Sequence, residues 1–389
     1  MNTKEKTSKY LFQNYARMDI CFTHGEGAYL YGTDGKRYLD LVAGIAVNSI
    51  GYAHPKWVKA VSEQAARMAH TSNLYHVKEQ ADLAEKLASV TPKGMIKSLF
   101  VNSGAEANEG ALKLAVRYTK RKRVLSSLNS FHGRLAASLG ATGQTKYQES
   151  FEPLIPKCFD YFKFGDPEEF KSKITKDTAA VILEPIQAEG GVQIAKKEFF
   201  KTVRDVCTDI GALMIVDEVQ TGMGRTGEWF GIQNYDVTPD IMTLAKALAG
   251  GVPMGAIVTT PEIASVLTPG THGTTFGGGP LACAAASATL DIIKEEKLVQ
   301  NAKTLGKKWV SDLKNIKSSD ITEVRGLGLI IGIEMKEHAN DVKAHALSNG
   351  ILVNVCHLNT VRLIPPLILK EGQADTFTEL LKAFLTKYN

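Results

Sequence analysis

Cysteine is scarce in this chain of 389 residues, and its spacing provides neither a disulfide framework nor a metal site. The five cysteines are far apart and form no C-x-x-C pair. A few scattered cysteines are typical of a protein from a reducing compartment, so we expect a cytoplasmic location. The nine histidines show no H-E-x-x-H or similar metal-ligand spacing, and we expect no metal.

Long hydrophobic runs and an excess of one charge are also missing. No stretch of 18 or more apolar residues occurs, so no membrane span is expected. Residues 1–19 lack the apolar core of a signal peptide. The formal net charge is only +5, without a long basic run, which gives no reason to expect nucleic acid as a partner. The remaining candidates are globular enzymes or binding proteins that act on small molecules.

The middle of the chain alternates short apolar runs with amphipathic segments. Because most of the apolar runs are continuous, the strands they predict should be buried on both faces. The segments 106–120 and 198–210 are predicted as helices. This alternation predicts an α/β fold, a mostly parallel sheet wrapped by helices. The predicted strands are 98–101, 124–128, 179–183, 213–216, 241–244 and 256–259.

The chain is long enough for a large domain and a smaller one. We predict that residues 56–286 form the large domain, that 287–389 form a small α+β domain, and that the N-terminal segment 1–55 joins the small domain. Within the last region we expect a long helix, two strand-like runs and a final helix, in the order 287–313, 327–334, 350–355 and 373–385.

Two charged residues directly follow predicted strands, where ligands bind in open α/β sheets. Lys246 has apolar neighbours, and desolvation would lower its pKa and make it a stronger nucleophile toward an aldehyde. Asp217 ends an apolar strand and needs a partner there, for which a protonated pyridine nitrogen is suitable. The alternatives are a surface lysine that opens a helix and an aspartate that caps a loop.

The segment Ser103–Glu106 has the form of a capping box at the start of a helix. Free amides at a helix start suit a phosphate, and Gly104 would let it approach closely. A plain capped helix is the alternative. Glu106 and Glu109 would repel a phosphate dianion, so we expect both to point away from it.

The segment Gly222–Gly227 matches the G-x-G-x-x-G pattern of dinucleotide-binding turns. However, residues 217–221 separate it from the preceding strand, and no long amphipathic helix follows. Without a strand–turn–helix context the match is weak evidence. A nicotinamide-dependent oxidoreductase is therefore kept only as an alternative.

Taken together, these segments resemble the class III (ornithine-type) aminotransferases, a subgroup of the fold type I pyridoxal-phosphate enzymes. The likeness runs nearly from end to end, and its motifs occur in the family's order. One departure is Gly279 before Pro280, where the family commonly has asparagine, and we expect it to alter a loop rather than the chemistry. The motifs are 102–108 (NSGAEAN), 131–134 (FHGR), 184–191 (EPIQAEGG), 217–222 (DEVQTG), Lys246 and 274–278 (TTFGG).

The resemblance implies that pyridoxal 5'-phosphate is bound covalently by Lys246, which would also act as general base. It implies that Asp217 pairs with the pyridine nitrogen, and that the protein is a homodimer with shared sites. The other implied cofactor contacts are Gly104 and Ala105 at the phosphate, Phe131 and Val219 on the two ring faces, Gln220 at the phenolic oxygen, and Thr275 at the phosphate in the neighbouring subunit.

The resemblance also implies the substrate contacts. Arg134 would bind the carboxylate far from the reacting amine, with Thr274 nearby, because the planar guanidinium bonds both carboxylate oxygens. Arg362 would bind the α-carboxylate of glutamate, and Glu189 would mask Arg362 when the amine substrate is bound. Tyr15 occupies the place of a substrate-side tyrosine. Ordinary salt bridges, and core or interface packing for Tyr15, are the alternatives.

Within this family the likeness is greatest to members that act on N-acetylornithine. The expected reaction moves the δ-amino group to 2-oxoglutarate and gives N-acetylglutamate 5-semialdehyde and glutamate, a step of arginine biosynthesis. The same residues would serve another ω-amine: ornithine, succinylornithine, 4-aminobutyrate or a lysine-pathway amine. An aminomutase of the same fold would need no 2-oxoglutarate. A non-catalytic binding protein would be expected to lack Lys246 or Asp217, and both are present.

Overall fold

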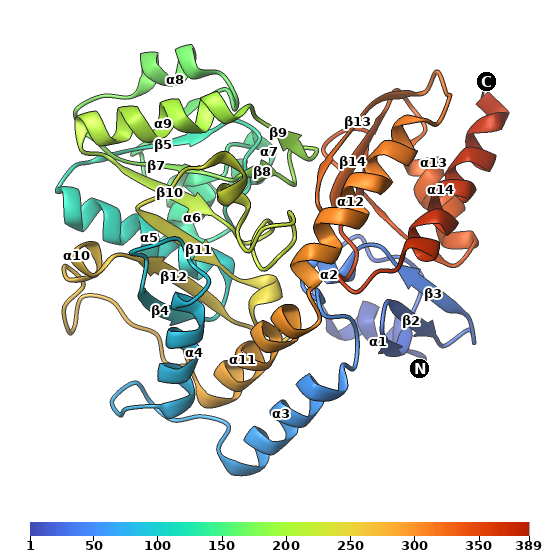
Figure 1. The fold of residues 1–389 in the computed structure, drawn as a ribbon, viewed down its shortest axis with the longest axis horizontal. Coiled ribbons are helices and arrows are strands. Elements are labelled where there is room, and N and C mark those ends of the chain that lie inside the picture. The colour runs from blue at the N-terminus through green and yellow to red at the C-terminus, as the bar shows by residue number, and fades with distance from the viewer. Residues whose placement is uncertain (389) are drawn as a thin grey trace.

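The computed structural model describes residues 1–388, and a seven-stranded sheet lies at the centre of its larger part (Figure 1). The strand order is β4-β12-β11-β10-β7-β5-β6, and all neighbours are parallel except the two pairs that include β12. All six predicted strands are present, which confirms the mostly parallel α/β sheet. The strands are β4 (Lys97–Val101), β5 (Arg123–Ser127), β6 (Phe159–Phe162), β7 (Thr178–Leu183), β10 (Leu213–Asp217), β11 (Ile241–Leu244) and β12 (Gly255–Thr259).

Side chains along the central strands alternate between two hydrophobic cores, one on each face of the sheet. In β10, Met214 and Val216 belong to one core, which includes residues of α9, whereas Leu213 and Ile215 belong to the other, which includes residues of α5. Since both faces are covered, every position of the strand is apolar until Asp217. The covering helices are α5 (Gly104–Thr119) and α9 (Lys197–Ile210).

The single long helix predicted for 287–313 was wrong, because the structure has two helices there. Helix α11 ends at Glu295, and Lys297 adopts a left-handed backbone with φ of 55° before α12 begins. Helix α11 packs against α3 and α4, whereas α12 packs on β13, so the predicted domain boundary at residue 287 lies inside α11. The bounds are α3 (Pro55–Arg67), α4 (Lys78–Ala88), α11 (Pro280–Glu295) and α12 (Leu298–Lys314).

The C-terminal region contains an antiparallel sheet of order β13-β14-β17-β16. The predicted run 327–334 is not one strand, because it includes the turn at Gly328, where φ is +59°. The run 350–355 divides likewise into β15 and β16. The elements are β13 (Ile321–Leu327), β14 (Ile330–Met335), α13 (Ala339–Ser348), β15 (Ile351–Leu352), β16 (Asn354–Cys356), β17 (Thr360–Leu363), α14 (Glu371–Leu385) and η4 (Thr386–Tyr388).

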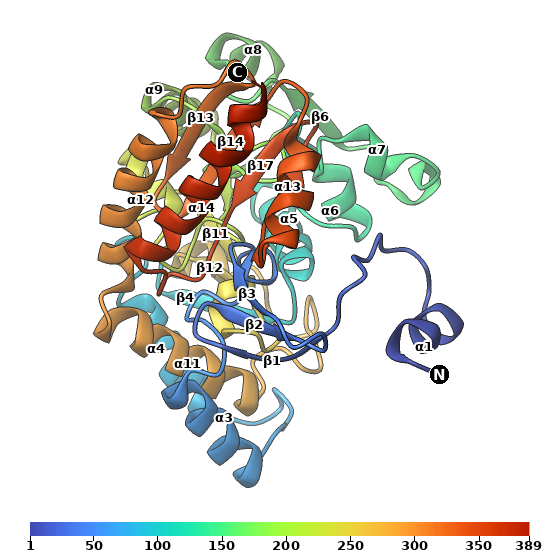
Figure 2. The ribbon, with the colours of Figure 1, turned by 90° about the vertical axis from the view of Figure 1, so that its right-hand side faces the viewer.

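The N-terminal segment is connected to the C-terminal region through a second sheet, in which β3 pairs in parallel with β15. Helix α1 stands apart from the rest of the chain at the end of an extended arm (Figure 2). Within residues 1–388, no helix combines the length and apolar character that crossing a membrane requires. The elements of this segment are α1 (Thr3–Tyr10), β1 (Phe22–Glu26), β2 (Tyr29–Gly32), β3 (Arg37–Asp40) and α2 (Ala43–Ala46).

Short elements complete the larger part and occupy the connections between its strands. They are α6 (Ala136–Ala141), α7 (Thr145–Gln148), η1 (Glu152–Leu154), α8 (Pro167–Lys173), β8 (Ile186–Gln187), β9 (Gln193–Ile194), η2 (Gly231–Tyr235), η3 (Lys246–Ala249) and α10 (Pro261–Ala264).

The contact between α12 and the β13–β14 turn requires a glycine at position 306. A Cβ atom there would lie 2.1 Å from the carbonyl oxygen of Gly328. We predict that Gly306→Ala lowers the free energy of unfolding by about 1–3 kcal/mol, because backbone must move to admit the methyl group. Chemical denaturation measures the change. The matched control is Gly372→Ala in α14, where an added Cβ meets nothing within 4 Å. Equal stability of the two variants would contradict the prediction.

Candidate active site

A pocket of about 490 Å³ opens at the carboxyl ends of the central strands. Residues that follow five strands meet there, as the sequence predicts: Asn102 after β4, Phe131 after β5, Glu184 after β7, Asp217 at the end of β10 and Lys246 after β11. The predicted site residues that line the pocket are Gly104, Ala105, Phe131, Arg134, Asp217, Val219, Gln220 and Lys246.

Lys246 follows β11 and begins the short helix η3, with a left-handed φ of 46°. Burial lowers the pKa of Lys246 to about 8, although nearby Glu189 opposes this shift. Within residues 1–388, its Nζ atom has no hydrogen-bond or ion-pair partner. A substantial fraction of this amine is therefore neutral near physiological pH and free to react with a carbonyl group.

Asp217 is buried at the end of β10, and both of its oxygens are hydrogen-bonded. Oδ1 accepts a bond of 3.0 Å from the amide of Val219. Oδ2 accepts bonds of 2.8 Å from Asn108 Nδ2 and from His132 Nδ1. Asn108 in turn accepts a bond of 2.7 Å from the hydroxyl of Thr243. This network holds the carboxylate in one orientation at the pocket wall.

His132 also lines this pocket, although it was not among the predicted site residues. Its ring is buried against Asp217, and its Nε2 atom has no partner in the described part of the chain. The bond to the carboxylate favours the tautomer with a proton on Nδ1. The only available signal was its position directly after Phe131, and nothing in the sequence indicates a contact with a residue 85 positions away.

The start of α5 differs in one respect from the predicted capping box. Ser103 Oγ accepts a bond of 3.1 Å from the amide of Glu106, as expected. The Glu106 carboxylate, however, accepts bonds of 2.8 Å from the amide and side chain of Asn102 rather than from Ser103. That part of the prediction was wrong, because Asn102 presents two donors to the same oxygen. The carboxylate of Glu109 accepts a bond from the amide of Ser138, and neither glutamate lines the pocket.

The amides of Gly104 and Ala105 remain available at this helix start, since within residues 1–388 neither has a hydrogen-bond acceptor. Both residues line the pocket. A Cβ atom at position 104 would lie only 2.9 Å from a methyl group of Val219. The glycine thus leaves room beside two free donors at the positive end of a helix, which is an arrangement that suits a phosphate.

Arg362 and Glu189 form an ion pair directly behind Gln220. Arg362 Nη1 lies 2.6 Å from Glu189 Oε1, and Gln220 hydrogen-bonds both side chains. Burial would raise the pKa of Glu189, but the charge and the hydrogen bond of Arg362 hold it below its usual range. The guanidinium is therefore covered by a carboxylate of its own chain.

Arg134 is held differently, at the mouth of the pocket. Its guanidinium carbon lies 5.0 Å from the ring centroid of Tyr147 and 6.0 Å from that of Phe131. In the described part of the chain, Arg134 has no carboxylate partner and donates no hydrogen bond.

Glu184, behind Phe131, accepts a bond of 3.1 Å from the Phe131 amide. Burial, with the charge of Asp217, raises the pKa of Glu184 well above its usual range.

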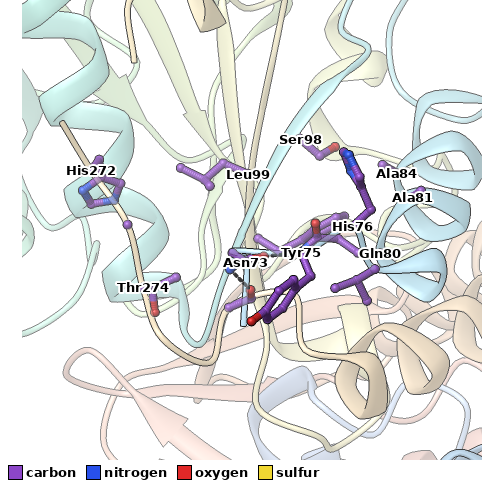
Figure 3. A pocket seen from close by; sticks show the side chains of 14 residues that line it. Asn73, Tyr75, His76, Gln80, Ala81, Ala84, Ser98, Leu99, His272 and Thr274 are labelled. Atoms are coloured by element: carbon purple, nitrogen blue, oxygen red, sulfur yellow. Dashed lines mark hydrogen bonds between the residues drawn. The ribbon is translucent and has the colours of Figure 1, made fainter. Parts of the chain in front are cut away.

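Besides Arg362 and Glu189, which lie next to Gln220, three further predicted residues do not line this pocket. Tyr15 lies on the N-terminal arm and is 65% exposed. Thr274 accepts a bond of 2.9 Å from Asn102 Nδ2 and borders a second pocket, of about 470 Å³, with Asn73 and Tyr75 (Figure 3). Thr275 is exposed next to it. Within one chain the structure brings none of the three to Lys246, so their roles stay predictions.

The glycine-rich segment 222–227 is a buried connection rather than a dinucleotide-binding turn. Arg225 donates hydrogen bonds to the carbonyl oxygens of Leu329 and Pro365 and to the hydroxyl of Ser49. It therefore joins the N-terminal segment, the large sheet and the C-terminal region.

Comparison with known proteins agrees with this geometry. A family model described as aminotransferase class-III matches residues 10–385. This chain belongs to the class III aminotransferases. The nicotinamide alternative is thereby rejected, and the chain is a pyridoxal-phosphate-dependent enzyme. The residues at the pocket fit that cofactor: a free amine at Lys246, a fixed carboxylate at Asp217 and two free amides at the start of α5.

Relatives match over nearly the whole length. The acetylornithine aminotransferase of Methanocaldococcus jannaschii is 45% identical, and the match covers 97% of this chain and 96% of that protein. The one from Methanosarcina mazei is 44% identical over 97% and 95%. The ornithine aminotransferase of Toxoplasma gondii ME49 has a TM-score of 0.95 at 31% identity, covering 100% of this chain and 96% of the other. The acetylornithine aminotransferase of Elizabethkingia anophelis has a TM-score of 0.87 at 32% identity, covering 99% and 98%.

The lowered pKa of Lys246 predicts how cofactor capture depends on pH. The neutral amine is the nucleophile, so the rate of covalent capture by the cofactor-free protein should rise through about pH 8 rather than through the ordinary lysine value of 10.5. Visible absorbance after mixing with pyridoxal phosphate measures the rate. Free Nα-acetyl-lysine is the reference that corrects for titration of the cofactor itself. A midpoint equal to that of the reference would show that burial leaves the amine unperturbed.

Proposed function

We propose that this enzyme transfers the δ-amino group of N-acetylornithine to 2-oxoglutarate, giving N-acetylglutamate 5-semialdehyde and glutamate. The observation that carries the proposal is the contrast between two arginines. Arg134 is exposed at the pocket mouth without a carboxylate partner, whereas Arg362 is covered by Glu189. One site thus offers one open and one masked carboxylate-binding group.

The two substrates differ in the number of carboxylates that they bring. N-acetylornithine has a single carboxylate, far from its reacting amine, and Arg134 would bind it while Glu189 keeps Arg362 neutralised. Glutamate and 2-oxoglutarate have a second carboxylate beside the reacting carbon. That group would take the place of Glu189 on Arg362, because the guanidinium can bond both oxygens of either carboxylate. The exchange lets one pocket accept two shapes.

The chain's own residues would also move the proton. When bound, pyridoxal phosphate supplies an electron sink that stabilises a carbanion at the substrate carbon. With its pKa near 8, the amine of Lys246 would act as the general base that removes the proton from that carbon. Asp217 would keep a negative charge opposite the pyridine nitrogen, Gln220 would bond the phenolic oxygen, and Phe131 and Val219 would hold the ring between them.

A second candidate is another ω-amine, such as ornithine, because the Toxoplasma gondii ornithine aminotransferase has the same fold with a TM-score of 0.95. Succinylornithine, 4-aminobutyrate and lysine-pathway amines would use the same residues. The names of the 42–45% identical relatives support N-acetylornithine as the first choice. The substrates are small molecules in either case. We also propose a cytoplasmic location, as expected from the scattered cysteines.

Steady-state kinetics of two arginine variants test the proposal. We predict that Arg134→Gln raises KM for both N-acetylornithine and 2-oxoglutarate, by about ten- to hundredfold, since each loses a charge-assisted bond to its distal carboxylate. Arg362→Gln should raise KM by a similar factor for 2-oxoglutarate alone.

Because Arg362→Gln leaves Glu189 without its partner, the matched control is the double variant Arg362→Gln with Glu189→Gln, which removes both charges. The split between substrates should persist in it. Equal effects of Arg362→Gln on both substrates would contradict the masking role of Glu189. Turnover of ornithine or 4-aminobutyrate in preference to N-acetylornithine would replace the substrate and keep the enzyme class.

We also propose a homodimer with shared sites, in which Thr275 reaches the cofactor phosphate of the partner subunit. An apolar surface supports it: Leu74, Tyr75 and Phe276 are 85%, 69% and 66% exposed. Tyr75 and Thr274 border the second pocket in Figure 3, so this surface adjoins the loop that carries Thr275. Large side chains exposed together are typical of a surface that a partner covers.

Light scattering should therefore give twice the mass of the 42.3 kDa chain. We predict that Phe276→Glu shifts the mass toward the monomer and lowers activity, because a charge buried in the interface has no partner. Leu358→Glu is the control, since Leu358 is 77% exposed on the β16–β17 turn, away from this surface. A monomeric wild-type protein with full activity would overturn the shared site.

A further inference from the structure

We propose that Tyr147 is a positioning residue for carboxylate binding, which acts by holding the guanidinium of Arg134 against its ring. The inference rests on the proposed role of Arg134 and deepens it. Tyr147 belongs to the short helix α7, outside every motif that identifies the family in this sequence.

Tyr147 contacts both groups that define the mouth of the pocket. The Arg134 guanidinium carbon lies 5.0 Å from its ring centroid, within the range of a cation–π interaction. Its ring meets that of Phe131 edge to face, with centroids 5.5 Å apart and planes at 80°. One side chain thus supports the ring proposed to stack on the cofactor and the cation proposed to bind the substrate.

Gln144 fixes the start of α7 to the segment that carries Phe131 and Arg134, and Gln148 fixes its end to other neighbouring elements. Gln144 Nε2 donates to the carbonyl oxygens of Asn129 and Ser130, at 3.2 and 3.1 Å. On the other side, Gln148 Nε2 donates to the carbonyl oxygen of Thr142, at 2.8 Å, and to the hydroxyl of Tyr161, at 2.9 Å. The ring of Tyr147 is therefore fixed relative to the arginine that it contacts.

An aromatic ring suits this task better than a carboxylate would. A carboxylate at position 147 would occupy the planar donors of Arg134 and compete with the substrate. The ring face attracts the cation but takes none of its N–H groups, so the full set stays available. Lys146 Nζ lies 4.9 Å from the same centroid, so the ring attracts two positive charges at the pocket mouth. In the described part of the chain the Tyr147 hydroxyl has no partner. The aromatic ring is therefore the part of Tyr147 that we propose to hold Arg134.

The test compares two amines of equal chain length in single-turnover reactions of the holoenzyme, followed by cofactor absorbance. N-acetylornithine carries the distal carboxylate, and N-acetylputrescine is the same molecule without that carboxylate. The measured quantity is the ratio of their apparent dissociation constants, which isolates recognition of the carboxylate. We predict that Tyr147→Leu and Tyr147→Met, which both remove the ring, reduce this preference for N-acetylornithine by about two- to fivefold, in line with an exposed cation–π contact.

Tyr147→Phe keeps the ring and should restore the wild-type ratio. If Leu and Met weaken both amines equally, Tyr147 has only a structural role and the inference is overturned. A loss of the preference for N-acetylornithine in Tyr147→Phe would overturn it too, since the hydroxyl rather than the ring would then be responsible for that preference. Arg134→Gln separates the two proposals: if it leaves the ratio unchanged, the proposed role of Arg134 itself fails, whereas a changed ratio with unaffected Tyr147 variants rejects only the part assigned to Tyr147.

Discussion

The carboxylate of Asp217 is the interaction on which the arrangement of the site depends. A buried carboxylate is costly unless donors surround it, and here the donors come from three separate parts of the chain. Asn108 belongs to α5, His132 to the segment after β5, and Val219 to the loop after β10. Through Asn108 the network also reaches Thr243 on β11, three residues before Lys246. Satisfying one charge therefore orients α5, the segment after β5 and the strand that precedes Lys246 relative to one another.

Of the two arginines proposed to bind substrate, only one is paired with a carboxylate. Glu189 pairs with Arg362, and burial together with the charge of Asp217 raises the pKa of Glu184. Aromatic rings rather than a carboxylate support Arg134. In the proposed reaction this difference would let the site accept substrates with one or two carboxylates, since Arg134 would always be open and Glu189 could leave Arg362.

Sequence patterns predicted the parts of the fold that local properties control. Continuous apolar runs identified the strands that are buried on both faces, because burial on two sides removes alternation. Strand β6 was not predicted, since Asp160 interrupts it at the partly exposed edge of the sheet. The break between α11 and α12 also had no signal, because residues 295–297 are good helix formers and the left-handed turn at Lys297 arises from packing against different neighbours.

By itself the sequence predicted the family and its cofactor, because the motifs that carry the resemblance occur in the family's order. It also placed Lys246 and Asp217 directly after strands, at the edge of the sheet where side chains from separate strands meet. Only the tertiary structure decided which groups hold those residues in place. The contact of His132 with Asp217 and the contact of Tyr147 with Arg134 both depend on where separate segments meet. A hydrogen-bonding or aromatic side chain has several acceptable partners, and the fold selects among them by bringing one within reach.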